Sequence, residues 1–286
     1  MSAAGVPIAP SAFTFPSDAN ISMLFTHLPL NDRPAAAAEA GFDAVEVWWP
    51  FPTPTPSARE IGRFEAALRA AGTRLVSINL HEGDPHRGDR GRISWPHATD
   101  AVRANAEIVL DIAEATECRL VNALYGNRLP ELDPTVQRDV ALDNIAHLAQ
   151  RAGPRGITVV LETLNRFDSP AFPLIRLENT IRLLHEARER AGLDNIALLF
   201  DVYHLHRSGS DLVEQIRLAA DRIAHVQLAD DPGRGRPGSG AIDFPAVLEA
   251  LHDVGYRGYL GLEYIPEPDS PGGRPLLNDL LRKETA

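Results

Sequence analysis

The sequence predicts an α/β protein whose single domain is a (β/α)8 TIM barrel. Short apolar runs rich in Val, Ile and Leu alternate with longer helical patterns, an order typical of parallel βα units. The runs are continuous rather than alternating, as expected for strands that are covered on both faces. The 286 residues hold eight such units, whereas a doubly wound sheet would usually show fewer units or a second domain.

The predicted strands are placed at the apolar runs. They begin at Ile21 (ISMLFT), Ala44 (AVEVWW), Arg74 (RLVSINL), Cys118 (CRLVNAL), Gly156 (GITVVLE), Asn195 (NIALLFD), Arg222 (RIAHVQL) and Gly258 (GYLGLEY). We therefore expect a flexible leader over residues 1–19, the barrel over residues 20–266 and a C-terminal tail over residues 267–286.

Two of the predicted helices have clear start signals. Ser57 and Glu60 match a capping box, and the helix that follows is expected to end at Gly72. Asp133 followed by Pro134 indicates a capped N-terminus with proline in the first turn. The apolar residues that follow each signal recur at helical spacing, so each helix is expected to bury one face. These faces carry Ile61, Phe64, Leu68 and Ala71 in the first helix and Leu142, Ile145, Ala146 and Ala149 in the second.

Charge and hydropathy exclude several classes of partner. The formal net charge of −11 repels phosphate backbones, which argues against a nucleic-acid partner. No apolar stretch is long enough to span a bilayer, and the N-terminus lacks the basic and apolar regions of a secretory signal. We expect a cytoplasmic protein with no membrane association that acts on a small molecule.

Cysteine and lysine are nearly absent. Cys118 is the single cysteine, and its place in an apolar run predicts a buried thiol rather than a reactive one. Lys283 is the single lysine and lies close to the C-terminus. A Schiff-base aldolase and a P-loop nucleotide-binding protein each need an internal lysine, so both are excluded.

Polar residues stand at the ends of four predicted strands. Because strand ends point to the catalytic face of a barrel, these side chains are expected to lie together. Three carboxylates in an apolar mouth repel one another unless a cation lies between them. An all-oxygen donor set suits Mg²⁺ or Mn²⁺ better than Zn²⁺, although the nearby His204 could broaden the choice. The four residues are Glu162, Asp201, Gln227 and Glu263.

Several longer motifs follow one another in a recognisable order. They are ISMLFTHLP, AAAAEAGFDAVEVWWPF, NLHEGDPHRGDRG, LETLNRFDSPAF, FDVYH, HVQLADDPGRGRPGSGAIDF and GYLGLEY. With these motifs the chain resembles the hydroxypyruvate isomerase family over about residues 20–266. That family belongs to the xylose-isomerase-like barrels, together with the ketose 3-epimerases. The resemblance implies a metal held by Glu162, Asp201, Gln227 and Glu263, with Glu162 and Glu263 also moving protons.

The resemblance also implies substrate contacts. It assigns His204 to a substrate hydroxyl or carbonyl. Arg234 matches a family arginine, and a guanidinium is well shaped to bind a carboxylate such as that of hydroxypyruvate. The family's NLPAGD segment is NLHEGD in this chain, which places His81 at a changed substrate rim. The polar segment from His81 to Pro96 is expected to form a lid or rim over the site.

The predicted reaction interconverts hydroxypyruvate and tartronate semialdehyde through an enediolate. Glu263 is assigned as the base and Glu162 as its partner, but their order stays open. A ketose 3-epimerase or another sugar or 2-oxo-acid isomerase remains an alternative, because residues 162–168 partly resemble the epimerase loop.

Two more distant alternatives remain. A metal-barrel endonuclease would need a basic groove, which the negative charge disfavours. A non-catalytic sugar-binding barrel would not exchange substrate hydrogen with solvent. A homo-oligomer stays open, since family members commonly associate.

Overall fold

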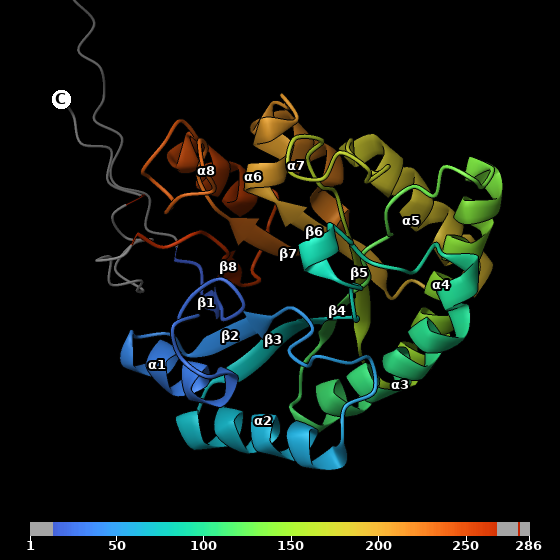
Figure 1. The fold of residues 1–286 in the computed structure, drawn as a ribbon. Coiled ribbons are helices and arrows are strands. Elements are labelled where there is room, and N and C mark those ends of the chain that lie inside the picture. Colours follow the sequence, from blue (N-terminus) through green and yellow to red (C-terminus); the bar gives the residue numbers. More distant parts are fainter. Residues whose placement is uncertain (1–13, 268–279, 281–286) are drawn as a thin grey trace, which may run out of the picture.

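The computed structural model describes residues 14–267 and residue 280, and its strands form one closed parallel barrel in chain order (Figure 1). Each strand pairs with its sequence neighbours, and the first pairs with the last. The predicted (β/α)8 TIM barrel is confirmed. The strands are β1 Ser17–Asn20, β2 Ala44–Val47, β3 Arg74–Asn79, β4 Leu120–Asn122, β5 Thr158–Glu162, β6 Ile196–Asp201, β7 Ile223–Leu228 and β8 Leu260–Leu262.

Helices ring the barrel on its outer side (Figure 1). Two helices rather than one connect β6 to β7. The α-helices are α1 Arg33–Glu39, α2 Ala58–Ala71, α3 Thr99–Ala115, α4 Pro134–Ala152, α5 Leu177–Ala191, α6 Val202–Arg207, α7 Leu212–Ala219 and α8 Phe244–Asp253. Short 3-10 turns are η1 Leu30–Asp32, η2 Pro85–Arg87, η3 Pro96–Ala98, η4 Gly153–Arg155 and η5 Ala220–Arg222.

The first strand lies earlier in the chain than the sequence analysis predicted. β1 spans Ser17–Asn20, and Ile21 begins the turn that follows it. The leader predicted over residues 1–19 is therefore wrong at its C-terminal end, and residues 1–13 lie outside the described residues. The sequence analysis placed the first strand at the apolar run from Ile21, whereas the residues that form β1 are mainly polar. Asp18 and Asn20 are buried, so their polar side chains serve the barrel interior rather than the surface.

The two helix starts that the sequence predicted are confirmed. Ser57 and Glu60 form a reciprocal capping box at the start of α2, and Gly72 ends that helix in the left-handed conformation. The Asp133 carboxylate accepts a hydrogen bond from the Thr135 backbone at the start of α4. Both helices bury apolar residues from the predicted stripes against the barrel.

The hydrophobic core lies mainly between the strands and the surrounding helices. A separate small cluster of Val160, Ala197 and Leu199 is completely or almost completely shielded from solvent. Because alternate residues of a strand point to the same face, Val160 and Leu199 lie one layer below Glu162 and Asp201. The barrel interior thus changes from apolar to polar toward the carboxyl ends of its strands.

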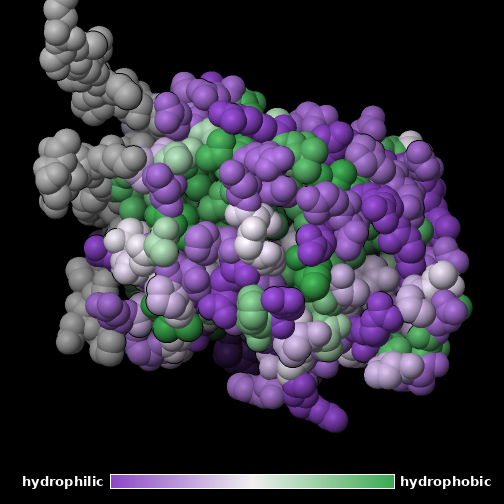
Figure 2. Space-filling model, turned by 90° about the horizontal axis from the view of Figure 1, so that it is seen from above, coloured by the Kyte–Doolittle hydropathy of each residue, from purple (hydrophilic) through white to green (hydrophobic). Residues whose placement is uncertain are grey.

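The described surface of the protein is mainly hydrophilic on the face shown in Figure 2. No helix in the described part of the chain combines the length and apolar character required to cross a membrane. Most of the tail predicted over residues 267–286 lies outside the described residues, but Leu280 packs against the hydrophobic core.

The capping box yields a stability prediction. Ser57→Ala removes the hydroxyl that accepts from the Glu60 backbone N–H at 3.3 Å. We expect the free energy of unfolding to fall by about 1 kcal/mol, a typical value for the loss of an N-cap. Urea denaturation of Ser57→Ala and of Ser57→Thr, which keeps the hydroxyl, measures this effect. Equal destabilisation in the two variants would show that the hydroxyl contributes nothing.

Candidate active site

The four residues that the sequence placed together converge at the carboxyl end of the barrel. Glu162 and Asp201 end β5 and β6, Gln227 lies in β7, and Glu263 follows β8 directly. All four are at least nine-tenths buried. Asp201 and Gln227 are register partners on adjacent strands. One oxygen of Glu162, one of Asp201 and a ring nitrogen of His204 lie within 4.8 Å of one another.

This cluster places more negative charge in the barrel than its own cations neutralise. Burial, together with repulsion from Glu263 and Asp201, raises the pKa of Glu162 well above its ordinary value. Burial raises the pKa of Asp201 to about 6 and that of Glu263 to about 8, although Arg234 lowers both. A further positive charge between these carboxylates would therefore be strongly stabilising.

The side-chain amide of Gln227 is oriented by a single hydrogen bond. Its amide nitrogen donates to Glu46 Oε1 at 2.8 Å, and a carboxylate oxygen can only accept. This contact fixes the orientation of the amide, so Gln227 Oε1 points the other way. Among the described residues, that buried oxygen has no hydrogen-bond donor. Three carboxylates and one unpartnered amide oxygen fit a divalent cation that prefers oxygen ligands.

Glu46 is a site residue that the sequence analysis missed. One of its oxygens accepts from Gln227 and from Asn20, and the other lies 2.6 Å from His225 Nε2. Burial alone would raise the pKa of Glu46, but the charge and hydrogen bond of His225 and the amide donors lower it. The sequence showed only one acidic residue within the apolar run AVEVWW. Nothing in that run indicated which residues the carboxylate would contact.

A glycine makes room for this carboxylate. A Cβ on Gly261 would lie 2.9 Å from Glu46 Oε1, which is closer than such atoms approach. Asp18 lies beside Glu46 and His225. Neither of its carboxylate oxygens has a hydrogen-bond partner among the described residues. Burial and the nearby Glu46 raise the pKa of Asp18 well above its ordinary value, which favours its neutral form.

His204 is held as a hydrogen-bond donor to the cavity. The Asn165 backbone N–H donates to His204 Nδ1 at 3.2 Å, so the neutral ring carries its proton on Nε2. That nitrogen lies 3.9 Å from Glu162 Oε1 and 3.7 Å from Asp201 Oδ2. Burial and the charge of Arg234 lower the pKa of His204 well below its ordinary value. The ring is therefore neutral and can donate to a substrate oxygen.

Arg234 lies in the site, but its guanidinium already has partners. Its Nη2 donates to Glu263 Oε2 at 2.6 Å and lies 3.6 Å from Asp201 Oδ2. The guanidinium also stands 5.5 Å from the centre of the Tyr203 ring. These contacts raise its pKa further despite burial. The predicted position in the site agrees with the structure, whereas the carboxylate role of Arg234 stays a prediction.

The cavity beside these residues has a volume of about 110 Å³ and is lined by residues from the carboxyl ends of the strands, from the loops that follow them and from α6. Sequence reasoning missed several of its lining residues, because they lie in loops where no periodicity reports orientation. Glu82 is one of them, and burial raises its pKa to about 7 although Asn79 donates to it. The lining residues that the sequence analysis did not assign individually are Trp48, Asn79, Glu82, Pro85, Arg90, Leu124, Leu164, Asp168 and Ser169, and three of them, Glu82, Pro85 and Arg90, belong to the rim that it predicted from His81 to Pro96.

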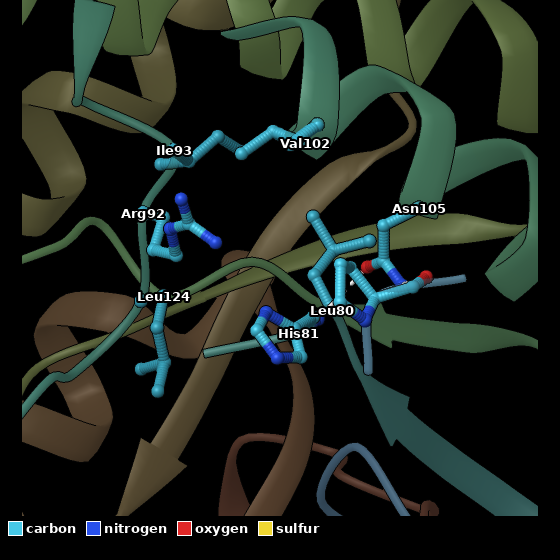
Figure 3. Close-up of a pocket in the computed structure, with 10 residues that line it drawn as sticks. Leu80, His81, Arg92, Ile93, Val102, Asn105 and Leu124 are labelled. Carbon is cyan, nitrogen blue, oxygen red and sulfur yellow. Dashed lines mark hydrogen bonds between the residues drawn. The ribbon is translucent and has the colours of Figure 1, made fainter. Parts of the chain in front are cut away.

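His81 does not line the central cavity. Its backbone N–H donates to Asn105 Oδ1 at 2.8 Å, and its ring lies in a neighbouring cavity with Arg92. Figure 3 shows the His81 and Arg92 side chains directed into the same space, beside Leu124. An outer cavity contains His81 and shares Trp48 with the central one. His81 can therefore meet only a substrate that extends beyond the central cavity.

Comparisons with known proteins agree with this architecture. A family model described as "Xylose isomerase-like TIM barrel" matches residues 34–281. A Streptomyces coelicolor protein assigned as a hydroxypyruvate isomerase is 42% identical over 252 residues, covering 87% of this chain and 90% of that protein. A 2-oxo-tetronate isomerase of Pectobacterium atrosepticum is 31% identical, with 93% and 98% covered.

A solved structure is similar over almost the whole chain. It is described as an AP endonuclease, family 2, from Brucella melitensis, and it superposes with a TM-score of 0.81 at 30% identity. The match covers 91% of this chain and 96% of that one. The closed barrel, the acidic site at its carboxyl end and these matches lead to one conclusion: the chain belongs to the xylose isomerase-like TIM barrel family, among the relatives of hydroxypyruvate isomerases.

Proposed function

We propose that this isomerase interconverts hydroxypyruvate and tartronate semialdehyde in a metal-dependent reaction. The observation that carries the proposal is the pair Glu162 and Glu263, which line one cavity with the neutral donor His204, whose Nε2 lies 3.9 Å from Glu162 Oε1. The substrate carries a carbonyl beside a CH₂OH group, and its isomer has the two oxygen functions exchanged. A proton must therefore leave one carbon and return to its neighbour.

The two glutamates are held for this transfer by different donors. Asn122 Nδ2 donates to Glu162 Oε2 at 2.8 Å, while Asn20 Nδ2 donates to Glu263 Oε1 at 3.0 Å. Trp48 Nε1 also donates to Glu263. Fixed carboxylates lose little entropy when they meet the substrate, which lowers the barrier to proton transfer. We assign Glu263 as the base that takes the carbon-bound proton and Glu162 as its partner.

The two glutamates, together with an aspartate and a glutamine, would also hold the metal. Glu162, Asp201, Gln227 and Glu263 are the proposed ligands, and Mg²⁺ or Mn²⁺ suits their oxygen donors. When bound, the cation polarises the substrate's oxygens and stabilises the negative charge that develops as carbon is deprotonated. His204 Nε2–H donates to the substrate oxygen nearest Glu162, and Arg234 holds Glu263 in place and binds the substrate beside it.

A longer substrate is the second candidate. The outer cavity adjoins the central one at Trp48, Glu82 and Pro85, so a 2-oxo acid or ketose with a longer carbon chain has room to extend toward His81. The similarity to a 2-oxo-tetronate isomerase supports this alternative. A nuclease is less well supported, because the chain carries a net charge of −11 and His204 is the only histidine among the described lining residues of the central cavity.

Metal removal tests the proposed cofactor. Dialysis against a chelator should abolish isomerisation of hydroxypyruvate, and Mn²⁺ or Mg²⁺ should restore it, because the buried carboxylates lose their neutralising cation. Asp201→Asn should lower the affinity for the metal, measured by calorimetry on stripped protein. Full turnover of protein shown to be metal-free would contradict the proposal.

Replacement of the base tests the proton transfer. Glu263→Gln keeps the shape and an oxygen donor but removes the basic carboxylate, so kcat should fall by about 10²- to 10⁴-fold. Glu162→Gln should show a comparable defect if the two residues act on the same enediolate. The measurement is exchange of substrate hydrogen with deuterated water at verified metal occupancy. Near-normal exchange in metal-replete Glu263→Gln would assign the base to another residue.

A further inference from the structure

The central cavity contains two guanidinium groups that differ in their partners. Arg234 is engaged by the Glu263 carboxylate at 2.6 Å and by the Glu263 carbonyl at 3.3 Å. Arg90 lines the same cavity, but within residues 14–267 and 280 it forms no ion pair. Its Nη1 donates only to the Asp89 backbone carbonyl, at 2.8 Å. Arg90 is thus the cavity cation that no carboxylate of the described residues engages, and most of its N–H groups have no acceptor among those residues.

The positive charge of Arg90 acts on the cavity. It lowers the pKa of Glu82 and the pKa of His204, which line the same cavity. Arg90 is only partly buried, so water solvates it while no ligand is present. A ligand that replaces this water must supply matching acceptors, or the guanidinium loses hydrogen bonds.

The loop that carries Arg90 is closed by its own contacts. The Gly91 N–H donates to the Glu82 carbonyl at 2.9 Å, and Gly91 forms an isolated antiparallel bridge with Tyr125. Gly91 has a φ of 89°, and a Cβ there would lie 2.1 Å from the Leu124 carbonyl oxygen. The backbone beside Arg90 is therefore fixed against the β4 side of the barrel. A fixed backbone lets the guanidinium meet a ligand with a small loss of entropy.

We propose that Arg90 binds the carboxylate of the substrate and gives the site its preference for short 2-oxo acids over neutral sugars. The inference rests on the proposed isomerase function and specifies its substrate class. A guanidinium binds a carboxylate through two parallel hydrogen bonds, which neither a hydroxyl nor a carbonyl reproduces. A neutral ketose in the same position leaves this cation dehydrated and poorly paired, so discrimination follows from the unmet donors.

The test compares two substrates that differ only at the group in question. Hydroxypyruvate and dihydroxyacetone share a HOCH₂–CO unit, and the first carries a carboxylate where the second carries CH₂OH. In metal-loaded enzyme, Arg90→Ala should raise KM for hydroxypyruvate by about 10- to 100-fold, the effect of losing hydrogen bonds to a charged group. The kcat/KM for dihydroxyacetone should change by less than about threefold, and the preference for the acid should shrink accordingly.

Matched variants separate this role from a structural one. Arg90→Lys keeps the charge without the planar fork and should recover part of the preference. Arg87→Ala removes an exposed cation from the same loop, outside the central cavity, and should leave both substrates unaffected. An equal loss on both substrates in Arg90→Ala would overturn the inference, as would a loss of the preference in Arg234→Ala alone.

A binding experiment distinguishes failure of this inference from failure of the proposed reaction. Glycerate and glycerol are a non-reacting pair that differ by a carboxylate, and calorimetry on metal-loaded protein measures their affinities without turnover. Tighter binding of glycerate that disappears in Arg90→Ala supports the inference even if hydroxypyruvate is not isomerised. Equal binding of both compounds by the unmodified protein overturns it, whatever the reaction proves to be.

Discussion

The buried Glu46 carboxylate is the contact on which the polar half of this barrel depends. It accepts hydrogen bonds from side chains of β1 and β7 and comes from β2, so it joins three strands across the barrel axis. A buried charge is tolerated only when its lone pairs are satisfied, and here every partner is a donor or a cation. Loss of the Glu46 carboxylate would leave several buried donors unpaired at once.

The hydrogen bonds of Glu46 also affect the next layer of the barrel, where the proposed metal ligands lie. Glu46 binds the amide nitrogen of Gln227 and leaves the Gln227 oxygen without a donor among the described residues, and Asn20, held by Glu46, donates to Glu263 as well. Gly261 contributes by lacking a side chain, because a Cβ there would collide with Glu46. The orientation of two proposed metal ligands is therefore set one layer below the site. The chemistry at the mouth of the barrel and the packing of its interior are parts of one hydrogen-bond network.

The two arginines illustrate how charge is divided in the site. Arg234 neutralises part of the permanent acidic cluster through Glu263 and Asp201, whereas Arg90 stands at the rim with donors to spare. A cavity lined by Glu82, Glu162 and Glu263 would repel a carboxylate-bearing substrate without such cations. In the proposed function, Arg90, Arg234 and the neutral donor His204 offset this repulsion and select the anions that bind.

The amino-acid sequence by itself determined the barrel, the two capped helices and the four polar strand ends, because these follow from local patterns. An apolar run predicts a buried strand, and Ser57 and Asp133 cap helices through bonds to residues close in sequence. Glu162, Asp201, Gln227 and Glu263 interrupted such runs, and parallel strands bring their ends together in any barrel.

Only the tertiary structure decided which of the remaining polar residues belong to the site. Glu46 and Gln227 lie 181 residues apart and meet only when the barrel closes. The polar strand β1 escaped a prediction based on apolar runs because its partners, Glu46 in β2 and Glu263 after β8, lie far from it in the sequence. Glu82 rather than His81 faces the central cavity because the chain leaves its strand after Asn79, and the side chains no longer alternate in a loop. Pairings between distant segments and loop orientation have no local pattern, so they emerge only when the chain is folded.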